Sequence, residues 1–255
     1  MRALITGASS GIGRDMAREL ANKNYDLILV ARNKEGLEDL QKNLKLKHPN
    51  IDIEIHSYDL SIKENCFELH EKAKDIDILI NNAGFGLFGK FTNTDLEKEV
   101  NMINTNITAL HVLTKLYLKD MVEKDRGKIL NVASIAGFMP GPLMATYYAS
   151  KNYVVALTRA INKELKKDKS NVKISLLCPG PVDTNFNNVA DVKFKIKGLT
   201  SEFVAKYAVN KMLKGKLIIV PGFSVRSARR FIEILPDRIT EIFAYNSQVR
   251  KESRK

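Results

Sequence analysis

The sequence predicts an α/β fold in which a doubly wound parallel sheet of about seven strands carries helices on both faces. Short apolar runs rich in Val, Ile and Leu alternate along the chain with segments whose apolar residues recur at helical spacing. That alternation indicates parallel strands joined by helical crossovers. Several runs also end in small or polar residues, among them Thr6, Asn82, Ser134 and Pro179. Because such sheets bind ligands at the carboxyl ends of their strands, we expect a site at these ends.

The chain has 255 residues, of which 44% are hydrophobic, so it can bury one substantial core. Neither a linker-like stretch nor a repeat divides it, and we expect a single domain over residues 1–255 with a basic helical extension over residues 224–255. The run from Met1 enters a strand at once, which leaves no room for a secretory leader, and no apolar run approaches the length of a membrane-spanning helix. These features predict a cytoplasmic location.

Lys and Arg number 41 against 29 Asp and Glu, which gives a formal charge of +12 and favours anionic partners. The sequence contains no recognised nucleic-acid-binding motif, so we do not expect nucleic acid among them. Phosphorylated cofactors, acyl carriers and anionic membranes are open. Cys66 and Cys178 lack the spacing of a metal or redox pair, and the histidines are scattered, so we expect no metal and a reducing compartment.

The first strand is expected over residues 1–6 and is followed by a glycine-rich turn and a helix. Glycine permits a tight turn and lets a phosphate approach the backbone, while the start of the helix offers free N–H groups. Between a strand and a helix, this turn predicts a dinucleotide phosphate site, with a tight turn that holds no ligand as the alternative. The candidate residues are Thr6, Gly7, Ser9, Ser10, Gly11, Ile12 and Gly13.

The second strand, residues 25–31, ends beside Arg32. An acidic residue near here would bind the ribose 2′-hydroxyl of NAD, whereas an arginine suits the 2′-phosphate of NADP. The sequence therefore favours NADP(H) over NAD(H), with a solvated surface arginine as the alternative.

A helix over about residues 35–45 leads to a third strand over residues 51–56, and Asp59 and Leu60 lie just past it. The Asp59 carboxylate could bind the amino group of adenine, or it could cap the helix that begins near Ser61. The sequence leaves both roles open, and Asp59 and Leu60 are candidate cofactor residues.

The fourth strand, residues 76–80, runs into Asn81, Asn82, Ala83 and Gly84. Small residues at this place let a flat cofactor lie against the backbone. An asparagine amide can brace neighbouring strands through its donor and its acceptor. We therefore expect Asn82, Ala83 and Gly84 to contact the cofactor.

Two helical segments, about 95–105 and 106–119, precede a fifth strand over residues 128–134. The sixth and last strands are expected over residues 172–177 and 217–220. With the helix before the sixth strand, they complete the alternation of strands and helices.

That helix carries Tyr147 and Lys151, which are four residues apart and therefore share one helix face. A nearby ammonium favours the ionised form of a phenol. With the Ser134 hydroxyl at the end of the fifth strand, the pair could donate to a carbonyl oxygen and hand it a proton. Taken alone, the pair is a weak signal, because any helix can contain a tyrosine one turn before a lysine.

Several motifs stand in one order, and through them the chain resembles the short-chain dehydrogenase/reductase family from its start to the last predicted strand. The resemblance implies a compact, single-domain member with a Rossmann-like fold, a nicotinamide cofactor and oxidoreductase activity. It also implies a homodimer or homotetramer that packs the helices including the Tyr147 helix. The matching pieces are Thr6-Gly7-x-x-x-Gly11-x-Gly13, Asn81-Asn82-Ala83-Gly84, Asn106, Ser134, Tyr147-x-x-x-Lys151 and Pro179-Gly180.

By this resemblance, Tyr147 is the general acid in reduction and the base in oxidation. Lys151 and the nicotinamide charge would lower the pKa of Tyr147 from about 10 toward neutrality, and Lys151 would bind the nicotinamide ribose. Ser134 would orient and polarise the substrate carbonyl, and Asn106 would hold a water in a proton relay. Thr184 matches the family's hydroxyl near the nicotinamide carboxamide. The other cofactor contacts implied at this end are Pro179, Gly180 and Val182.

Apolar residues near the reactive end point to a lipophilic carbonyl compound, for which a 3-oxoacyl thioester and a steroid-like ketone are candidates. Core packing explains some of these residues equally well. They are residues 85–88 and 138–140, Leu143 and Met144. Tyr148 does not fit the family's spacing to Lys151, and we expect it to be an ordinary helix aromatic. The segment of about 185–199, with Lys193, Lys195 and Lys197, is either a lid or a solvated loop.

Two other functions are open on this scaffold. A non-catalytic NADP(H)-binding sensor or interaction protein would be expected to lack Tyr147, Lys151 or Ser134, and all three are present. A nucleotide-sugar epimerase would normally show a different glycine spacing and a longer substrate-binding portion.

The extension begins with a helix from Ser224 that Pro236 ends, and a second helical pattern follows through Ile239, Ile242 and Phe243. Its spacing predicts packing on the core or on a neighbouring subunit. The alternative is a basic amphipathic surface for an anionic membrane or an acidic acyl carrier. We expect Val225, Ala228, Phe231, Ile232 and Leu235 to face inward and Arg226, Arg229 and Arg230 to face outward.

Overall fold

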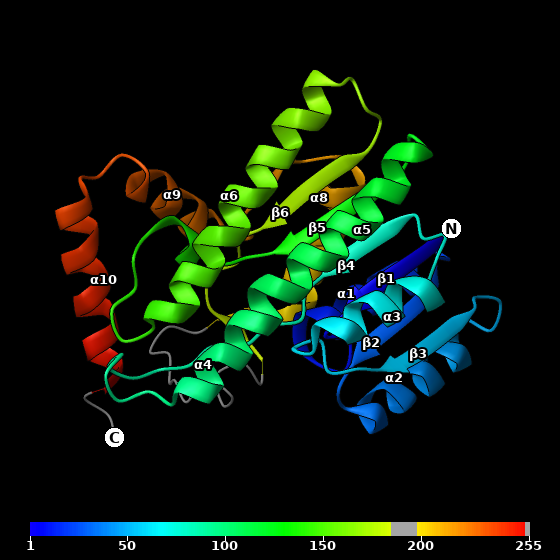
Figure 1. Cartoon of the computed structure of the whole chain (residues 1–255), viewed down its shortest axis with the longest axis horizontal. Coiled ribbons are helices and arrows are strands. Elements are labelled where there is room, and N and C mark those ends of the chain that lie inside the picture. Colours follow the sequence, from blue (N-terminus) through cyan, green and yellow to red (C-terminus); the bar gives the residue numbers. More distant parts are fainter. Residues whose placement is uncertain (185–197, 253–255) are drawn as a thin grey trace.

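The computed structural model of the chain describes residues 1–184 and 198–252. Seven strands form one parallel sheet in the order β3-β2-β1-β4-β5-β6-β9, which confirms the predicted doubly wound fold (Figure 1). The strands are β1 (Arg2–Thr6), β2 (Asp26–Ala31), β3 (Ile53–Ser57), β4 (Ile78–Asn81), β5 (Lys128–Val132), β6 (Lys173–Leu177) and β9 (Ile218–Ile219).

Helices cover both faces of the sheet because successive strand residues point to opposite sides. In β1, Ala3 and Ile5 pack under α1, α2 and α8, whereas Leu4 packs under α3, α5 and α6. The first layer comprises α1 (Gly11–Ala21), α2 (Lys34–Lys47) and α8 (Ser201–Leu213). The second layer comprises α3 (Lys63–Lys72), α4 (Leu96–Ile103), α5 (Leu110–Glu123) and α6 (Ala145–Lys167).

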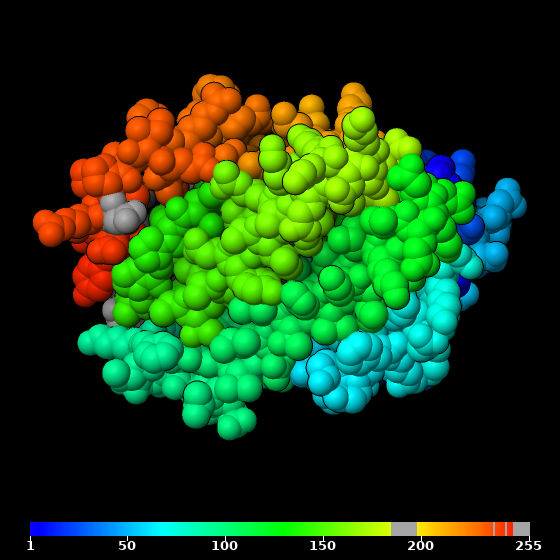
Figure 2. Space-filling view, turned by 45° about the horizontal axis from the view of Figure 1, so that its top comes forward, coloured from blue at the N-terminus to red at the C-terminus, as the bar shows by residue number. Residues whose placement is uncertain are grey.

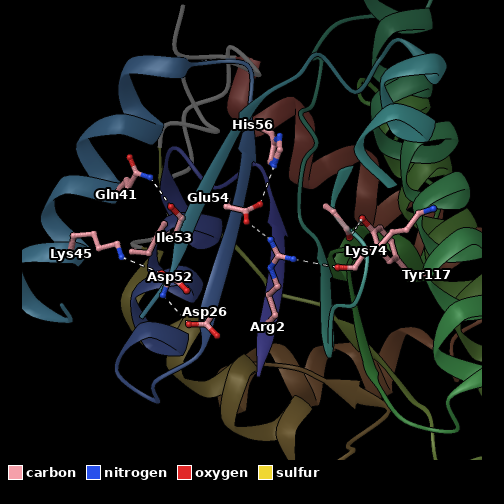
Figure 3. Close-up of polar contacts among 11 residues, drawn as sticks. Arg2, Asp26, Gln41, Lys45, Asp52, Ile53, Glu54, His56, Lys74 and Tyr117 are labelled. Carbon is pink, nitrogen blue, oxygen red and sulfur yellow. Dashed lines mark hydrogen bonds and ion pairs between the residues drawn. The ribbon is translucent and has the colours of Figure 1, made fainter. Parts of the chain in front are cut away.

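Polar contacts fasten the edge strand β3, which the loop with Asp59 follows. Figure 3 shows these contacts. Arg2 of β1 pairs with Glu54 of β3 at 2.5 Å. Gln41 Nε2 of α2 donates to the Ile53 carbonyl at 2.7 Å. These contacts satisfy polar groups that an edge strand would otherwise leave to solvent.

The strand order reverses between β1 and β4, so the loops that follow these strands diverge and leave a crevice at their carboxyl ends. Thr6 closes its floor: Oγ1 accepts from the backbone N–H of Asn82 and Ala83 at 2.9 and 3.0 Å. The same hydroxyl donates to the Ile80 carbonyl at 3.3 Å.

The stretch expected as two helices over 95–105 and 106–119 is one continuous helical path whose middle is π-helical. The π-helical turn η1 (Asn104–Ala109) joins α4 to α5. Such turns insert an extra residue into the helix and frequently lie at functional sites. The helix period therefore changes at Asn106, which helical spacing in the sequence does not reveal.

Two smaller differences from the sequence expectation lie around the site. The fifth strand ends at Val132, and a short 3₁₀ turn η2 (Ile135–Phe138) follows Ser134. A two-stranded ladder of β7 (Val182–Asp183) and β8 (Leu199–Thr200) was not expected. The segment of about 185–199, for which the sequence left a lid and a solvated loop open, falls mostly outside the described residues, Lys193, Lys195 and Lys197 included.

The C-terminal extension folds as α9 (Phe223–Ile232) and α10 (Asp237–Glu252), which lie together at one side of the sheet (Figure 1). The predicted orientation of this segment is wrong on both faces. Phe231 and Leu235, which were expected to face inward, are 68% and 37% exposed. The side chain of Arg229 is only 17% exposed, lies 4.9 Å from the centre of the Phe138 ring and pairs with Glu233 at 2.7 Å. Stacking on an aromatic ring and pairing with a carboxylate stabilise the guanidinium in this partly buried place.

Arg226 also turns inward, because its Nη2 donates to the Tyr207 hydroxyl at 2.8 Å. Of the three arginines expected outward, Arg230 is the exposed one. Within the described part of the chain, every helix falls short of the length and apolarity that crossing a bilayer requires.

Candidate active site

A cavity of about 1070 Å³ lies at the carboxyl ends of the strands. It runs from the glycine turn after β1 to the side chains of α6 and the C-terminal helices. The predicted site residues that line it are Gly7, Ser9, Ser10, Gly11, Ile12, Arg32, Asp59, Leu60, Asn82, Ala83, Gly84, Ser134, Tyr147, Lys151, Pro179, Gly180, Val182 and Thr184. Thr6, Gly13 and Asn106 lie behind the wall and shape it.

The glycine turn fits a phosphate because its backbone comes very close to α1. A Cβ on Gly13 would lie 2.3 Å from the Gly7 carbonyl oxygen, so a larger residue would force the turn away from the helix. Gly7 itself has a φ of +65°, a left-handed conformation that glycine adopts without strain. The Ser10 side chain does not cap α1, which leaves the first N–H groups of the helix to face the cavity. These residues fit the diphosphate of a dinucleotide.

Arg32 and Asp59 meet at the other end of the cavity. The Arg32 Nη1 lies 3.8 Å from Asp59 Oδ2, and the Arg32 side chain is 62% exposed, so the guanidinium is open to an anion. Asp59 Oδ1 accepts from the backbone N–H and the hydroxyl of Ser61 at 2.9 and 2.8 Å. Asp59 therefore fixes the turn before α3 and lines the cavity. It does not cap the helix, because α3 begins at Lys63 with Ile62 as its N-cap and without a side-chain cap. Binding of the adenine amino group stays a prediction.

The two asparagines after β4 have separate tasks. Asn82 Nδ2 donates to the carbonyl oxygens of Thr6 and Gly7 at 3.0 and 3.2 Å, which holds the glycine turn against β4. Asn81 Nδ2 donates to Asn131 Oδ1 and Thr114 Oγ1, both at 2.9 Å, which braces β4 against β5 and α5 as expected. Asn131, which no sequence motif singles out, extends this buried network to Thr158.

Asn106 grips the loop after β4 through both ends of its amide. Its Nδ2 donates to the Phe85 carbonyl at 2.9 Å, and its Oδ1 accepts from the Phe85 N–H at 3.1 Å. Nδ2 also donates to Ser150 Oγ at 3.1 Å, on the same helix as Tyr147. The side chain thus joins the loop to α6 from within the wall.

Ser134, Tyr147 and Lys151 converge in the middle of the cavity. The Ser134 and Tyr147 side chains share a hydrogen bond. The Lys151 Nζ lies 5.7 Å from the centre of the Tyr147 ring and donates to the Val132 carbonyl at 3.1 Å. Ser134 is itself held by the Ala136 N–H, which donates to its Oγ at 3.2 Å. A hydroxyl, a phenol and an amine therefore meet where a carbonyl oxygen could lie.

Burial sets the protonation of this cluster. It raises the pKa of Tyr147 above its usual value of about 10, although the Ser134 hydrogen bond acts in the opposite direction. Burial also lowers the pKa of Lys151 to about 8. The expectation that the pKa of Tyr147 falls is therefore not met by the protein's own groups, because desolvation of the phenolate outweighs the Ser134 hydrogen bond.

The cavity wall beyond the cluster is mostly apolar and differs in part from the set the sequence indicated. Phe85, Met139 and Met144 line it as expected. Phe138 instead lies under Arg229, and Phe88 packs against a small core around Met102. The residues that the sequence analysis did not place there include Tyr148, Val225, Ala228, Ile232, Ala244 and Asn246.

The C-terminal part of this wall could have been found from spacing. Val225, Ala228 and Ile232 recur at helical intervals on one face of α9, and this face borders the cavity. The position of Tyr148 depends on how α6 enters the site, which the sequence does not display.

Comparisons with known proteins agree with this geometry. Residues 1–193 match the family model described as short chain dehydrogenase. An uncharacterized oxidoreductase of Staphylococcus epidermidis is 34% identical over 88% of this chain and 96% of its own length. The ketoacyl reductase HetN of a Nostoc species is 34% identical over 84% of this chain and 75% of its own length.

Solved structures share the fold. A short-chain dehydrogenase from Sphingobium yanoikuyae in complex with NADPH superposes with a TM-score of 0.82 at 27% identity, covering 92% of this chain and 96% of that one. A structure from Burkholderia phymatum in complex with NAD, at 23% identity, gives a TM-score of 0.81 over 90% of this chain and 91% of that one. The fold thus accepts either dinucleotide. With a glycine turn, a Ser–Tyr–Lys cluster and a family model over three quarters of its length, the chain belongs to the short-chain dehydrogenase family of oxidoreductases.

Proposed function

We propose that the protein is an NADP(H)-dependent reductase or dehydrogenase that acts on the carbonyl or secondary alcohol of a lipophilic substrate. The observation that carries this proposal is the hydrogen-bonded pair of Ser134 and Tyr147, with Lys151 one helical turn away in the same cavity as the glycine turn. A non-catalytic sensor would have no need for this buried cluster, whose assembly requires the desolvation of two ionisable groups.

The glycine turn and the start of α1 would hold the cofactor diphosphate, and Arg32 would bind the 2′-phosphate. The exposed Arg32 guanidinium favours NADP(H), because its partner Asp59 lies 3.8 Å away and leaves most of its donors free for a phosphate. A bound nicotinamide supplies the hydride in reduction and accepts it in oxidation.

The chain's own groups then manage the substrate oxygen and its proton. Ser134 donates a hydrogen bond to the carbonyl oxygen, and Tyr147 transfers its proton to that oxygen as the alcohol forms. Tyr147 keeps its proton at neutral pH because its pKa is raised, and Lys151 is an ammonium below about pH 8. As the phenol loses its proton, this ammonium stabilises the phenolate.

The apolar wall supports a lipophilic substrate. Phe85, Met139, Met144, Val225 and Ile232 surround the reactive end. We infer that a 3-oxoacyl thioester is the leading candidate, supported by the ketoacyl reductase among the relatives, and that a steroid-like ketone is the second.

The test follows NADPH absorbance against a panel of ketones that includes acyl thioesters. Tyr147→Phe is expected to lose at least about a hundredfold in turnover, the usual range for a general acid, while NADPH binding measured by fluorescence is retained. Tyr153→Phe is the matched control, because Tyr153 lies on the same helix and binds His111 away from the cavity. Near-normal turnover in Tyr147→Phe would contradict the proposed role.

We propose a homodimer or homotetramer that packs α5 and α6, which lie side by side on one face and are joined by the His111–Tyr153 hydrogen bond (Figure 2). Light scattering on the purified protein tests the assembly.

Contact of the C-terminal helices with an anionic membrane or acyl carrier stays a prediction. Of the three arginines of α9, Arg230 is the exposed one. The buried, unpaired thiols of Cys66 and Cys178 support a reducing, cytoplasmic setting.

A further inference from the structure

Tyr148 follows Tyr147 in the chain and lines the same cavity. Consecutive residues of a helix normally point in directions well apart. Both rings reach the site because they stand nearly perpendicular, with an interplanar angle of 77° and ring centres 6.0 Å apart. A second aromatic ring therefore stands edge-on to the proton donor.

The Tyr148 ring packs on the backbone of Gly141, at a position where only glycine leaves room for the ring. We call this contact the Gly141 seat. A Cβ on Gly141 would lie 2.1 Å from Cγ of Tyr148 and within 2.4 Å of two further ring atoms, so the ring rests directly on the Gly141 backbone. This contact prevents the ring from moving back, away from the cavity.

Hydrogen bonds fix the loop that forms the seat. Asn152 Nδ2 lies within hydrogen-bond distance of three carbonyl oxygens, those of Ala136, Met139 and Tyr148, at 3.2, 3.1 and 2.9 Å. The Met144 N–H donates to the Gly141 carbonyl at 3.1 Å, and the Tyr148 N–H donates to the Met144 carbonyl at 3.0 Å. The loop and the first turn of α6 therefore hold the ring as one unit.

Some other walls of the reactive end are more adaptable. Met139 and Met144 are flexible thioethers that adjust to different shapes. Phe85 is held at its backbone by Asn106 and is, like the Tyr148 ring, a fixed part of the wall. Of these two aromatic rings, that of Tyr148 stands edge-on to the Tyr147 ring.

We propose that Tyr148 is a specificity-determining residue, whose ring limits the bulk of the substituent on the side of the substrate carbonyl that faces α6. An unbranched substituent on that side, such as either arm of a 3-oxoacyl thioester, would be accepted, and ketones branched beside the carbonyl on both sides would be excluded. The inference rests on the proposed reductase function and names the shape of its substrates.

The first experiment compares a methyl ketone whose other substituent is branched beside the carbonyl with its analogue in which isopropyl replaces methyl. Tyr148→Ala is expected to raise the ratio of kcat/KM for the isopropyl over the methyl ketone by about tenfold or more, since a pocket discriminates single methylenes by about tenfold or more. Tyr148→Phe keeps the ring and should keep the wild-type ratio. Tyr153→Ala, on the outer side of α6, is the matched control and should also keep it.

The second experiment moves the ring without removing it. Gly141→Ala forces the Tyr148 ring or the loop beneath it to shift, because its Cβ would overlap three ring atoms, and it should change the ratio. In the Tyr148→Ala background the same substitution should have no effect on the ratio, because the ring it acts through is gone. Tyr148→Leu provides a smaller wall with apolar packing retained, should Tyr148→Ala not fold.

Each outcome decides one statement. An unchanged ratio in Tyr148→Ala or Tyr148→Leu would contradict the proposal that the Tyr148 ring limits the bulk of the substituent. A Tyr148→Phe variant that behaves like Tyr148→Ala would contradict it too, since the hydroxyl would then set selectivity. Equal effects of Gly141→Ala in both backgrounds would contradict the statement that Gly141 acts by holding the Tyr148 ring in place. Absence of NADPH oxidation by the wild type with every ketone and thioester would instead contradict the proposed function.

Discussion

Asn106 holds Phe85 by its backbone in both directions, donating to its carbonyl at 2.9 Å and accepting from its N–H at 3.1 Å. Phe85 follows Gly84 at the cavity wall, so this pair of bonds fixes the loop that forms this part of the wall. The π-helical turn η1 places Asn106 at this loop, and its period differs from that of the regular α-helices α4 and α5 on either side of it.

Asn106→Asp is therefore expected to reduce the free energy of unfolding by about 1–3 kcal/mol, because a carboxylate cannot donate and leaves the Phe85 carbonyl unsatisfied. Chemical denaturation measures this loss. Asn43→Asp is the control, since the Asn43 amide makes one exposed bond within α2. Equal stability losses in the two variants would contradict a special role for the buried amide.

Arg32→Ala should raise the KM for NADPH by about tenfold to a hundredfold and leave the KM for NADH nearly unchanged, because only NADPH carries the 2′-phosphate. Steady-state kinetics with both cofactors measure the two values. Lys34→Ala is the matched control for Arg32→Ala, since Lys34 is exposed near Arg32 and pairs with Glu38 within α2. A parallel loss with both cofactors would show that Arg32 does not select between them.

The pKa of Lys151 predicts how stability depends on pH. The pKa lies near 8 in the folded protein and near 10.5 when unfolded, so between these values the unfolded chain binds the extra proton. Stability contributed by this group therefore rises as pH increases from about 8 to 10.5, by up to roughly 3 kcal/mol. Below pH 8 the buried ammonium destabilises the fold by a constant amount.

Lys151→Met isolates this contribution, because it removes the titrating group from both states. Denaturation of wild type and variant at several pH values gives the difference in unfolding free energy. That difference should move in favour of the wild type across the window from pH 8 to 10.5, and a flat difference would contradict the lowered pKa. The subtraction also cancels the opposite trend from Tyr147, whose raised pKa makes the fold lose stability above about pH 10.

The sequence predicted the sheet because each strand is a local apolar run, as in residues 25–31, and strand type follows from local pattern. The glycine turn was predictable for the same reason, since its residues are adjacent in the chain. Contacts between residues far apart in the sequence were not predictable in this way. The bond between Asn106 and Phe85 spans 21 residues, and a helix period that changes at η1 hides which side chains face inward.

The inward orientation of two arginines of α9 was likewise not predictable from the local sequence pattern. Helical spacing divided the helix into apolar and basic faces, and by hydrophobicity alone arginines belong outside. Arg229 contradicts that rule because Phe138 and Glu233 provide an aromatic face and a carboxylate at the right place, and neither contact is visible in a sequence pattern. The Tyr148 ring escaped prediction in the same way, because its seat at Gly141 depends on the loop's course.

Arg229→Ala is the last prediction and tests whether α9 positions the substrate wall. The guanidinium joins α9 to η2, the turn directly after Ser134, through its contact with Phe138. Loss of this contact, worth about 0.5–2 kcal/mol for a cation on a ring, should let Val225 and Ile232 move from the cavity. The KM for the ketone should then rise severalfold while NADPH affinity stays unchanged, because the cofactor end is formed by α1, β1 and β2. Arg230→Ala is the matched control, since Arg230 is an exposed neighbour on the same helix. If both variants alter the ketone KM equally, charge rather than the position of α9 would explain the effect; if NADPH affinity falls with the ketone KM, the helix would support the whole cavity and not its substrate end.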